Sequence, residues 1–142
     1  MVNSKLVSLL AVVACFTQPT VATYSAGKGG QINFYTDSSC SKYNGEAACW
    51  WNQSPYIGLE VSGGQTATCF SLNMPGNSLS INTADLWEES GTATKGQCFL
   101  FDGYGCTGNS VESTYTPGSG KCFASRSSAG WLWKSAWCST PY

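Results

Sequence analysis

The sequence predicts an all-β fold in which two related halves pack as a sandwich stapled by disulfides. The first reason is an internal repeat, because residues 30–42 and 96–108 carry Gly-Gln, an aromatic residue and a cysteine at the same offsets. The second is the composition, with eight cysteines and sixteen glycines in 142 residues. The third is the spacing of short runs of strand-forming residues between Gly, Pro, Asn and Ser clusters.

The first 22 residues read as a targeting segment. Lys5 precedes an apolar run over 6–16, and a polar stretch leads to Ala22. This order is typical of a secretory signal peptide, and we expect cleavage after Ala22 and an extracellular protein. The apolar run is shorter than the roughly 20 residues that span a bilayer, so we expect no membrane span.

The remaining residues, 23–142, are expected to form a single β domain of two halves. The halves cover about 30–82 and 96–138, and residues 83–95 are expected to link them. Within this linker, Thr83 is a suitable N-cap for a single helical turn over 83–89. Strands are expected at 31–35, 46–51, 57–61, 66–72, 78–82, 97–101, 109–114, 120–124 and 131–137.

The charge balance excludes one class of partner. Without Lys5 the chain keeps six basic and eight acidic side chains, a net charge of −2. Nucleic acids are bound by clusters of Lys and Arg, which this sequence lacks, so we expect no nucleic-acid partner.

Seven cysteines follow the signal peptide, so one has no partner within the chain. Cys40 and Cys106 occupy matching positions of the repeat, and Cys69 and Cys122 each precede a phenylalanine. We therefore predict the pairs Cys40–Cys69, Cys106–Cys122 and Cys98–Cys138 in the oxidising compartment. Cys49 is then either free or the bridge of a disulfide-linked dimer.

The repeat also carries a resemblance to a known family. The pattern is an aromatic residue, then four residues, an aromatic residue or cysteine, one residue and a glycine. The second copy meets it in full with Phe101, Cys106 and Gly108. The first copy meets it in part with Tyr35 and Cys40, since Lys42 occupies the glycine position. Residues 73–81 look like the later part of the same motif, whose serine bridges onto the folded hairpin. In the second half that serine is either Ser128 or Ser135.

These motifs resemble the βγ-crystallin double Greek key, especially the small, cysteine-rich, secreted fungal members that include killer-toxin-like proteins and effectors. The resemblance implies a double Greek-key sandwich and a role outside the cell that made it. Members of that family often bind calcium, but here only Asn73 and Ser78 match the ligand pattern, while Met74 and Asn77 do not. Since a hard cation needs several oxygens at once, we expect neither a metal site nor a cofactor.

Catalysis is not expected. The chain has no histidine, which removes the commonest general base and metal ligand. A small hydrolase would need two converging carboxylates, and the candidates are Glu60, Asp85, Glu88 and Glu89.

Exposed aromatic residues are the best candidates for binding. In an extended strand the side chains of Trp131, Trp133 and Trp137 would all project from the same face. This face is either a row of exposed rings that binds a partner or, for most of the row, part of the core. Trp50 and Trp51 are adjacent, and adjacent side chains in a strand point to opposite faces, so one of the two is expected to be exposed. The candidate binding residues are Trp50, Trp51, Tyr56 and Trp131.

The sequence therefore predicts a secreted, non-catalytic protein, and the resemblance implies that it is an effector or toxin-like protein that binds an extracellular protein or glycan. The alternative is a carbohydrate or cell-wall binding module.

Overall fold

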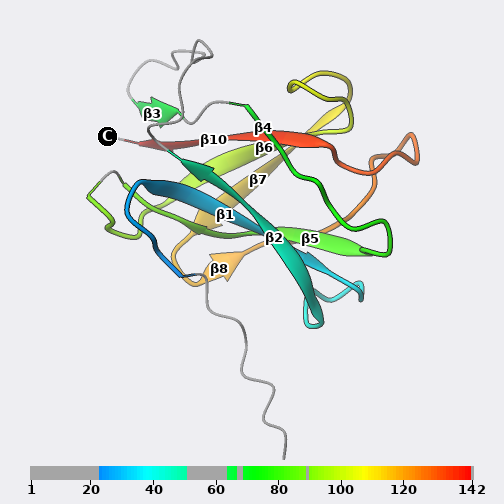
Figure 1. Ribbon diagram of the computed structural model, residues 1–142, viewed down its shortest axis with the longest axis horizontal. Coiled ribbons are helices and arrows are strands. Elements are labelled where there is room, and N and C mark those ends of the chain that lie inside the picture. The colour runs from blue at the N-terminus through cyan, green and yellow to red at the C-terminus, as the bar shows by residue number, and fades with distance from the viewer. Residues whose placement is uncertain (1–22, 51–63, 67–68, 89, 142) are drawn as a thin grey trace, which may run out of the picture.

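The computed structural model describes residues 23–50, 64–66, 69–88 and 90–141, which form two antiparallel β-sheets (Figure 1). The first sheet has the order β2 (Tyr43–Trp50), β1 (Lys28–Tyr35), β5 (Ser80–Leu86) and β9 (Cys122–Ala124). The second has the order β3 (Gly64–Thr66), β10 (Ser135–Pro141), β6 (Gly96–Phe101), β7 (Ser110–Thr116) and β8 (Ser119–Gly120), and β4 (Phe70–Ser71) also pairs with β10. The predicted all-β class is confirmed.

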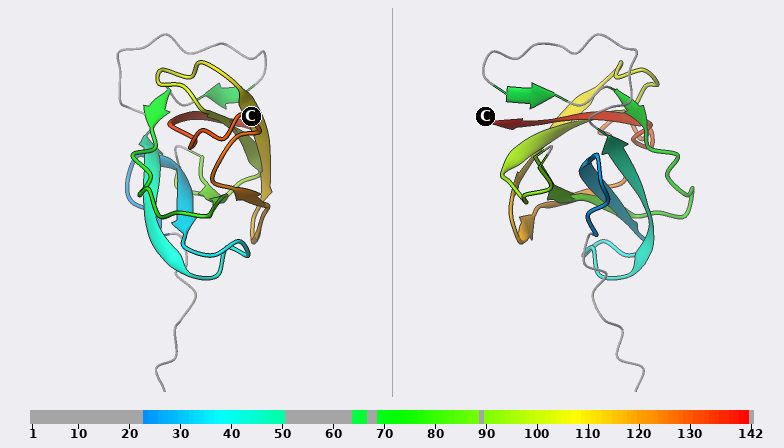
Figure 2. Two further views of the ribbon diagram at one scale, coloured as in Figure 1. Left: turned by 90° about the vertical axis from the view of Figure 1, so that its right-hand side faces the viewer. Right: turned by 60° about the vertical axis from the view of Figure 1, so that its left-hand side comes forward.

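The first half lends two short strands, β3 and β4, to the sheet of the second half, and the second half lends β9 to the sheet of the first. β4 belongs to the first half of the sequence but pairs with β10, with Phe70 opposite Ala136. β9 belongs to the second half but pairs with β5, with Phe123 opposite Ile81. The chain therefore crosses between the two layers, which the side views in Figure 2 separate.

The repeated sequence pattern corresponds to a repeated set of contacts. In the first half the Leu79 N–H donates to the Tyr35 carbonyl, and the Ser80 hydroxyl donates to the Asp37 carbonyl over 2.5 Å. In the second half the equivalent bonds run from Lys134 N–H to Phe101, and from the Ser135 hydroxyl to Gly103 over 2.6 Å. Of the two serines considered for this role in the second half, Ser135 makes the bridge and Ser128 is exposed.

The core lies between the sheets and follows the alternation of each strand. On β1, Ile32 and Phe34 point inward and are at most 1% exposed. Leu72, Ile81, Leu86, Leu100, Tyr115 and Trp133 complete the largest part of the apolar cluster, and Phe70 and Phe123 on the lent strands pack against it. The exchange therefore brings β4 and β9 to the shared core.

The glycine that opens each repeat is explained by close packing. A Cβ atom at Gly30 would lie 2.7 Å from Leu86, and one at Gly96 would lie 2.3 Å from the Ser139 carbonyl oxygen and 2.8 Å from Leu86. Both repeats therefore need glycine here because no side chain fits between the strand and its neighbours.

Two of the three predicted disulfide pairs are wrong. The bonds are Cys40–Cys122, Cys69–Cys106 and Cys98–Cys138, so only the last was predicted correctly. Cys40 and Cys106 occupy matching positions, as do Cys69 and Cys122, and the two bonds are equivalent as expected. However, each bond joins a cysteine of one half to a cysteine of the other half. The physical reason is the strand exchange, which places Cys69 beside the hairpin of the second half and Cys122 beside that of the first.

The predicted helical turn over 83–89 is also wrong. Residues 83–86 continue β5, and Leu86 lies opposite Gly30 of β1. Thr83 is 1% exposed, and its hydroxyl hydrogen-bonds the Ser113 hydroxyl at 2.8 Å instead of capping a helix. Pairing with β1 has overridden the local preference of this stretch.

Two of the expected strands have different outcomes. The expected strand at 57–61 lies outside the described residues, and that at 66–72 is represented by β3 and β4. Among the residues described, none belongs to a helix with the length and apolar character needed to cross a bilayer.

The disulfide map can be tested directly. Digestion of the unreduced protein should release Cys40 linked to Cys122 and Cys69 linked to Cys106 in mass spectra. Replacing Cys40 and Cys122 together by alanine should lower the free energy of unfolding in urea by about 2–5 kcal/mol. The exposed neighbour Ser38, changed to alanine, should alter it by less than about 0.5 kcal/mol. Recovery of a Cys40–Cys69 peptide would contradict the exchanged map.

Candidate functional site

Trp131 is presented by a tight hairpin between β9 and β10. The Ser127 N–H donates to the Trp131 carbonyl at 2.8 Å, the Trp133 N–H donates to Ser125 at 3.1 Å, and Gly130 has a φ of +84°. These bonds fix the backbone on both sides of the indole, while the side chain itself is 59% exposed. An exposed tryptophan on a hydrogen-bonded turn is a preformed contact surface.

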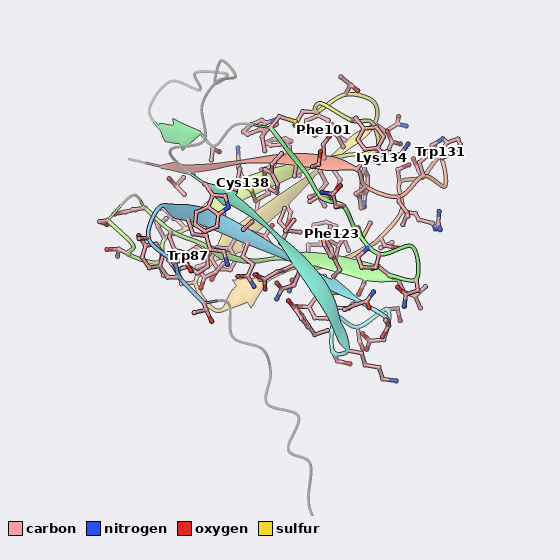
Figure 3. All side chains as sticks on the ribbon, in the orientation of Figure 1. Trp87, Phe101, Phe123, Trp131, Lys134 and Cys138 are labelled. Carbon is pink, nitrogen blue, oxygen red and sulfur yellow. A yellow bond between two sulfur atoms is a disulfide. The ribbon has the colours of Figure 1, made fainter. Side chains whose placement is uncertain are left out.

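Lys134 lies between two exposed aromatic rings. Its Nζ is 5.3 Å from the ring centroid of Tyr104 and 5.4 Å from that of Trp131. Cation–π contacts of this kind stabilise an exposed cation by roughly 0.5–1 kcal/mol each. Figure 3 shows Lys134 and Trp131 together at one edge of the molecule, with Trp87 at the opposite edge.

A pocket adjoins these rings. It has a volume of about 130 Å³ and is lined by Asn73, Met74, Tyr104, Leu132, Trp133 and Lys134. Trp133 is only 6% exposed and its indole N–H donates to the Ala124 carbonyl at 2.8 Å, so it forms a fixed wall of the pocket. We call Tyr104, Trp131, Lys134 and this pocket the aromatic–lysine site.

Three segments that are distant in sequence are held together at this site. Asp102 accepts hydrogen bonds from the backbone and side chain of Asn109, both at 2.8 Å, and from the Ser127 hydroxyl at 2.7 Å. The last bond joins the loop that carries Tyr104 to the hairpin that carries Trp131. The Cys69–Cys106 disulfide anchors the strand before Asn73 to the same loop.

These bonds also set the charge state of Asp102. Hydrogen bonds from the Asn109 side chain and then from Ser127 stabilise the carboxylate and lower the pKa of Asp102 below its ordinary value, and the charge of Lys134 adds to this effect. The carboxylate that joins the two loops is therefore ionised at neutral pH.

A second polar cluster lies on the first sheet, and its members on β1 are buried. Gln31 donates to Asn33 at 2.7 Å and to Glu46 at 2.8 Å, while Lys28 forms an ion pair with Glu46 at 3.5 Å. Tyr35 extends the cluster through a 3.1 Å bond to Asn82. These groups satisfy one another, so we interpret the cluster as structural.

The four predicted binding residues have different outcomes. Trp131 is exposed and belongs to the aromatic–lysine site. Trp50 is half-buried on β2, and Trp51 and Tyr56 lie outside the described residues. Trp131 and Trp133 precede β10, so they do not form the expected row with Trp137, which stacks on Phe99 at a centroid distance of 4.6 Å.

Cys49 is free and buried at 2% exposure. Removal from water raises the pKa of its thiol to about 12. A buried, protonated thiol is a poor nucleophile, and in this fold its sulfur is not accessible for the bridge of a disulfide-linked dimer.

Two of the four candidate catalytic carboxylates, Asp85 and Glu88, lie within the described residues. Asp85 accepts a hydrogen bond from the Tyr115 hydroxyl at 2.7 Å, and Glu88 lies in the turn that follows β5. Glu60 and Glu89 lie outside the described residues. Within the described ranges, no group of three or more His, Cys, Asp or Glu side chains is arranged to hold a metal ion.

Sequence reasoning missed Tyr104 and Lys134, and it considered Asn73 only as a calcium ligand. Tyr104 stands between two glycines at the tip of the repeat hairpin, which is a weak sign of an exposed ring. No local signal shows that Lys134, thirty residues later, lies over that ring. In comparisons with known proteins, no family model, curated protein or solved structure matches this chain.

The state of Asp102 predicts how stability depends on pH. Folding lowers the pKa of Asp102 below its value of about 3.9 in the unfolded chain. Its contribution to the free energy of unfolding is therefore fully present above about pH 3.9 and is lost as the pH falls through the pKa of the folded state. In thermal melts, Asp102→Asn should lose less stability below about pH 4 than the unaltered protein does. Some loss should remain, because the pKa of Asp37 is also lowered and its protonation also costs stability.

A matched pair of serines controls this experiment. Ser127→Ala removes one donor to Asp102 and should flatten the acid limb partly, whereas Ser128→Ala, at an exposed position in the same hairpin, should leave it unchanged. An acid limb that is identical in Asp102→Asn and the unaltered protein would contradict the assignment.

Proposed function

We propose that this chain is a secreted, non-catalytic protein that acts as an effector or toxin-like molecule by binding an extracellular partner through the aromatic–lysine site. The observation that carries the proposal is the pair of exposed rings, Tyr104 at 68% and Trp131 at 59%, on either side of Lys134. Exposed aromatic side chains on rigid loops supply large contact area at a low entropic cost.

The proposed kinship is with the βγ-crystallin double Greek key and its small fungal members. The exchange of β4 and β9 between the sheets supports it, as do the matching serine bridges from Ser80 and Ser135 to the two hairpins. This kinship supports a role outside the cell by analogy only.

Secretion is supported by the disulfides. The structure contains three of them, Cys40–Cys122, Cys69–Cys106 and Cys98–Cys138, and structural disulfides are typical of oxidising compartments, which agrees with the signal peptide expected over 1–22. A non-catalytic role is supported by the lack of histidine and by the use of Asp85 and Asp102 as hydrogen-bond acceptors within the fold.

A glycan is the second candidate partner. The pocket beside the rings holds about 130 Å³, which is small compared with the roughly 300–1,000 Å³ that encloses a drug-sized ligand. A sugar ring can place one of its C–H faces on an aromatic ring, whose face carries partial negative charge. This reading predicts that the fluorescence of Trp131 changes when chitin or glucan oligomers are added.

The proposal predicts which surface captures the partner. Immobilised mature protein should retain a defined protein or glycan from extracellular extracts, and Trp131→Ala or Tyr104→Ala should weaken that binding at least about tenfold. Leu79→Ala is the matched control, because Leu79 is 58% exposed and occupies the position equivalent to Lys134 in the first half. Equal binding by all three variants would place the contact elsewhere and contradict the proposal.

A further inference from the structure

We propose that the aromatic–lysine site binds a carboxylate-bearing sugar ring, the uronate residue of an acidic polysaccharide. The inference rests on the proposed function, since it assigns a ligand class to the same site. It depends on three observations: the size of the pocket, the two exposed rings and the availability of the Lys134 ammonium group.

The size of the site favours a ring over a protein surface. A stable protein interface buries about 800 Å² on each partner and has an apolar centre. Among the described residues, the exposed large hydrophobic side chains are Tyr43, Leu79, Tyr104 and Trp131, and only the last two belong to this site. A contact area built from two rings and a pocket of about 130 Å³ matches a small ligand.

The lysine favours an acidic ligand over a neutral one. Within the described part of the chain, the ion pair found is that of Lys28 with Glu46, so no carboxylate lies within ion-pair distance of Lys134. The nearby Asp102 already accepts three hydrogen bonds from Asn109 and Ser127. The Lys134 ammonium is therefore held by the two rings and retains its capacity to donate to an anion.

Neighbouring groups complete the site for an acidic sugar. Arg126 lies opposite Leu132 across the hairpin, and its guanidinium donates to the Gly130 carbonyl at 3.0 Å, which braces the turn that carries Trp131. Asn73, which lines the other side, offers an amide that can donate to ring hydroxyls. In this arrangement Trp131 or Tyr104 stacks on the C–H face of the sugar while Lys134 binds its carboxylate.

The experiment compares acidic and neutral ligands of the same shape. Trigalacturonate, its fully methyl-esterified form and a trimer of β-linked mannuronate are titrated into the mature protein, with tryptophan fluorescence and calorimetry as readouts. We expect the acidic trimers to bind at least tenfold more tightly than the ester, with a preference that weakens as salt is raised. Comparison of the two acidic trimers distinguishes the sources of the uronate.

Two lysine variants make the test specific. Lys134→Gln should reduce affinity for the acidic trimers about tenfold and leave binding of the ester nearly unchanged. Lys121→Gln is the matched control, because Lys121 also lies over an aromatic ring, 5.1 Å from the centroid of Phe123, but does not line the pocket. Trp131→Ala should weaken binding of both the acid and the ester.

Several outcomes would overturn the inference. Equal affinity for acid and ester, or unchanged binding in Lys134→Gln, would leave a neutral-glycan site in place but exclude the uronate. Binding of an aspartate-rich peptide and of none of the trimers would assign the site to a protein partner. If no trimer binds while Trp131→Ala still abolishes capture of an extracellular partner, the uronate inference fails and the proposed function stands.

Discussion

The exchange of short strands between the two halves is the constraint on which the rest of this structure depends. β4 and β9 are too short to be stable alone, but each pairs with the long last strand of the other half and brings a phenylalanine to the shared core. Cys69–Cys106 and Cys40–Cys122 then link each lent strand to the hairpin of the half that receives it. Unfolding one half therefore removes a strand from the other, which couples the two halves into one unit.

Much of the fold could be predicted because the repeat carries its own physical reasons. Gly30 and Gly96 are required by close packing against Leu86, and Cys40 and Cys106 both adopt a positive φ, of 54° and 56°. The disulfide pairing could not be predicted from the repeat. Two equivalent bonds result whether each cysteine pairs within its own half or with the other half, so the repeat does not distinguish the two arrangements. The helical turn failed for a related reason, because the pairing of β5 with β1 is a long-range contact that local propensity does not contain.

The candidate site was only partly predictable. Trp131 was identified as a member of the tryptophan row in the strand expected at 131–137; the strand begins only at Ser135, and it is the hairpin before it that exposes the indole. Tyr104 and Lys134 were missed because their proximity is created by the Asp102 hydrogen bonds and the return of the chain into β10. The residues next to Tyr104 or Lys134 in the sequence do not indicate a site, and it is their contact in the folded protein that places the ammonium group over the ring.

The internal symmetry of the fold makes the asymmetry of the site informative. In the first half, the positions equivalent to Tyr104 and Lys134 are Ser38 and Leu79. The Leu79 N–H makes the same backbone hydrogen bond as that of Lys134, but neither Ser38 nor Leu79 carries an aromatic ring or a charge. Stability therefore does not require a tyrosine or a lysine at this framework position, since the first half folds without them. The rings and the ammonium of the second half are additions to a scaffold that is already complete, which is the pattern expected of a surface kept for binding.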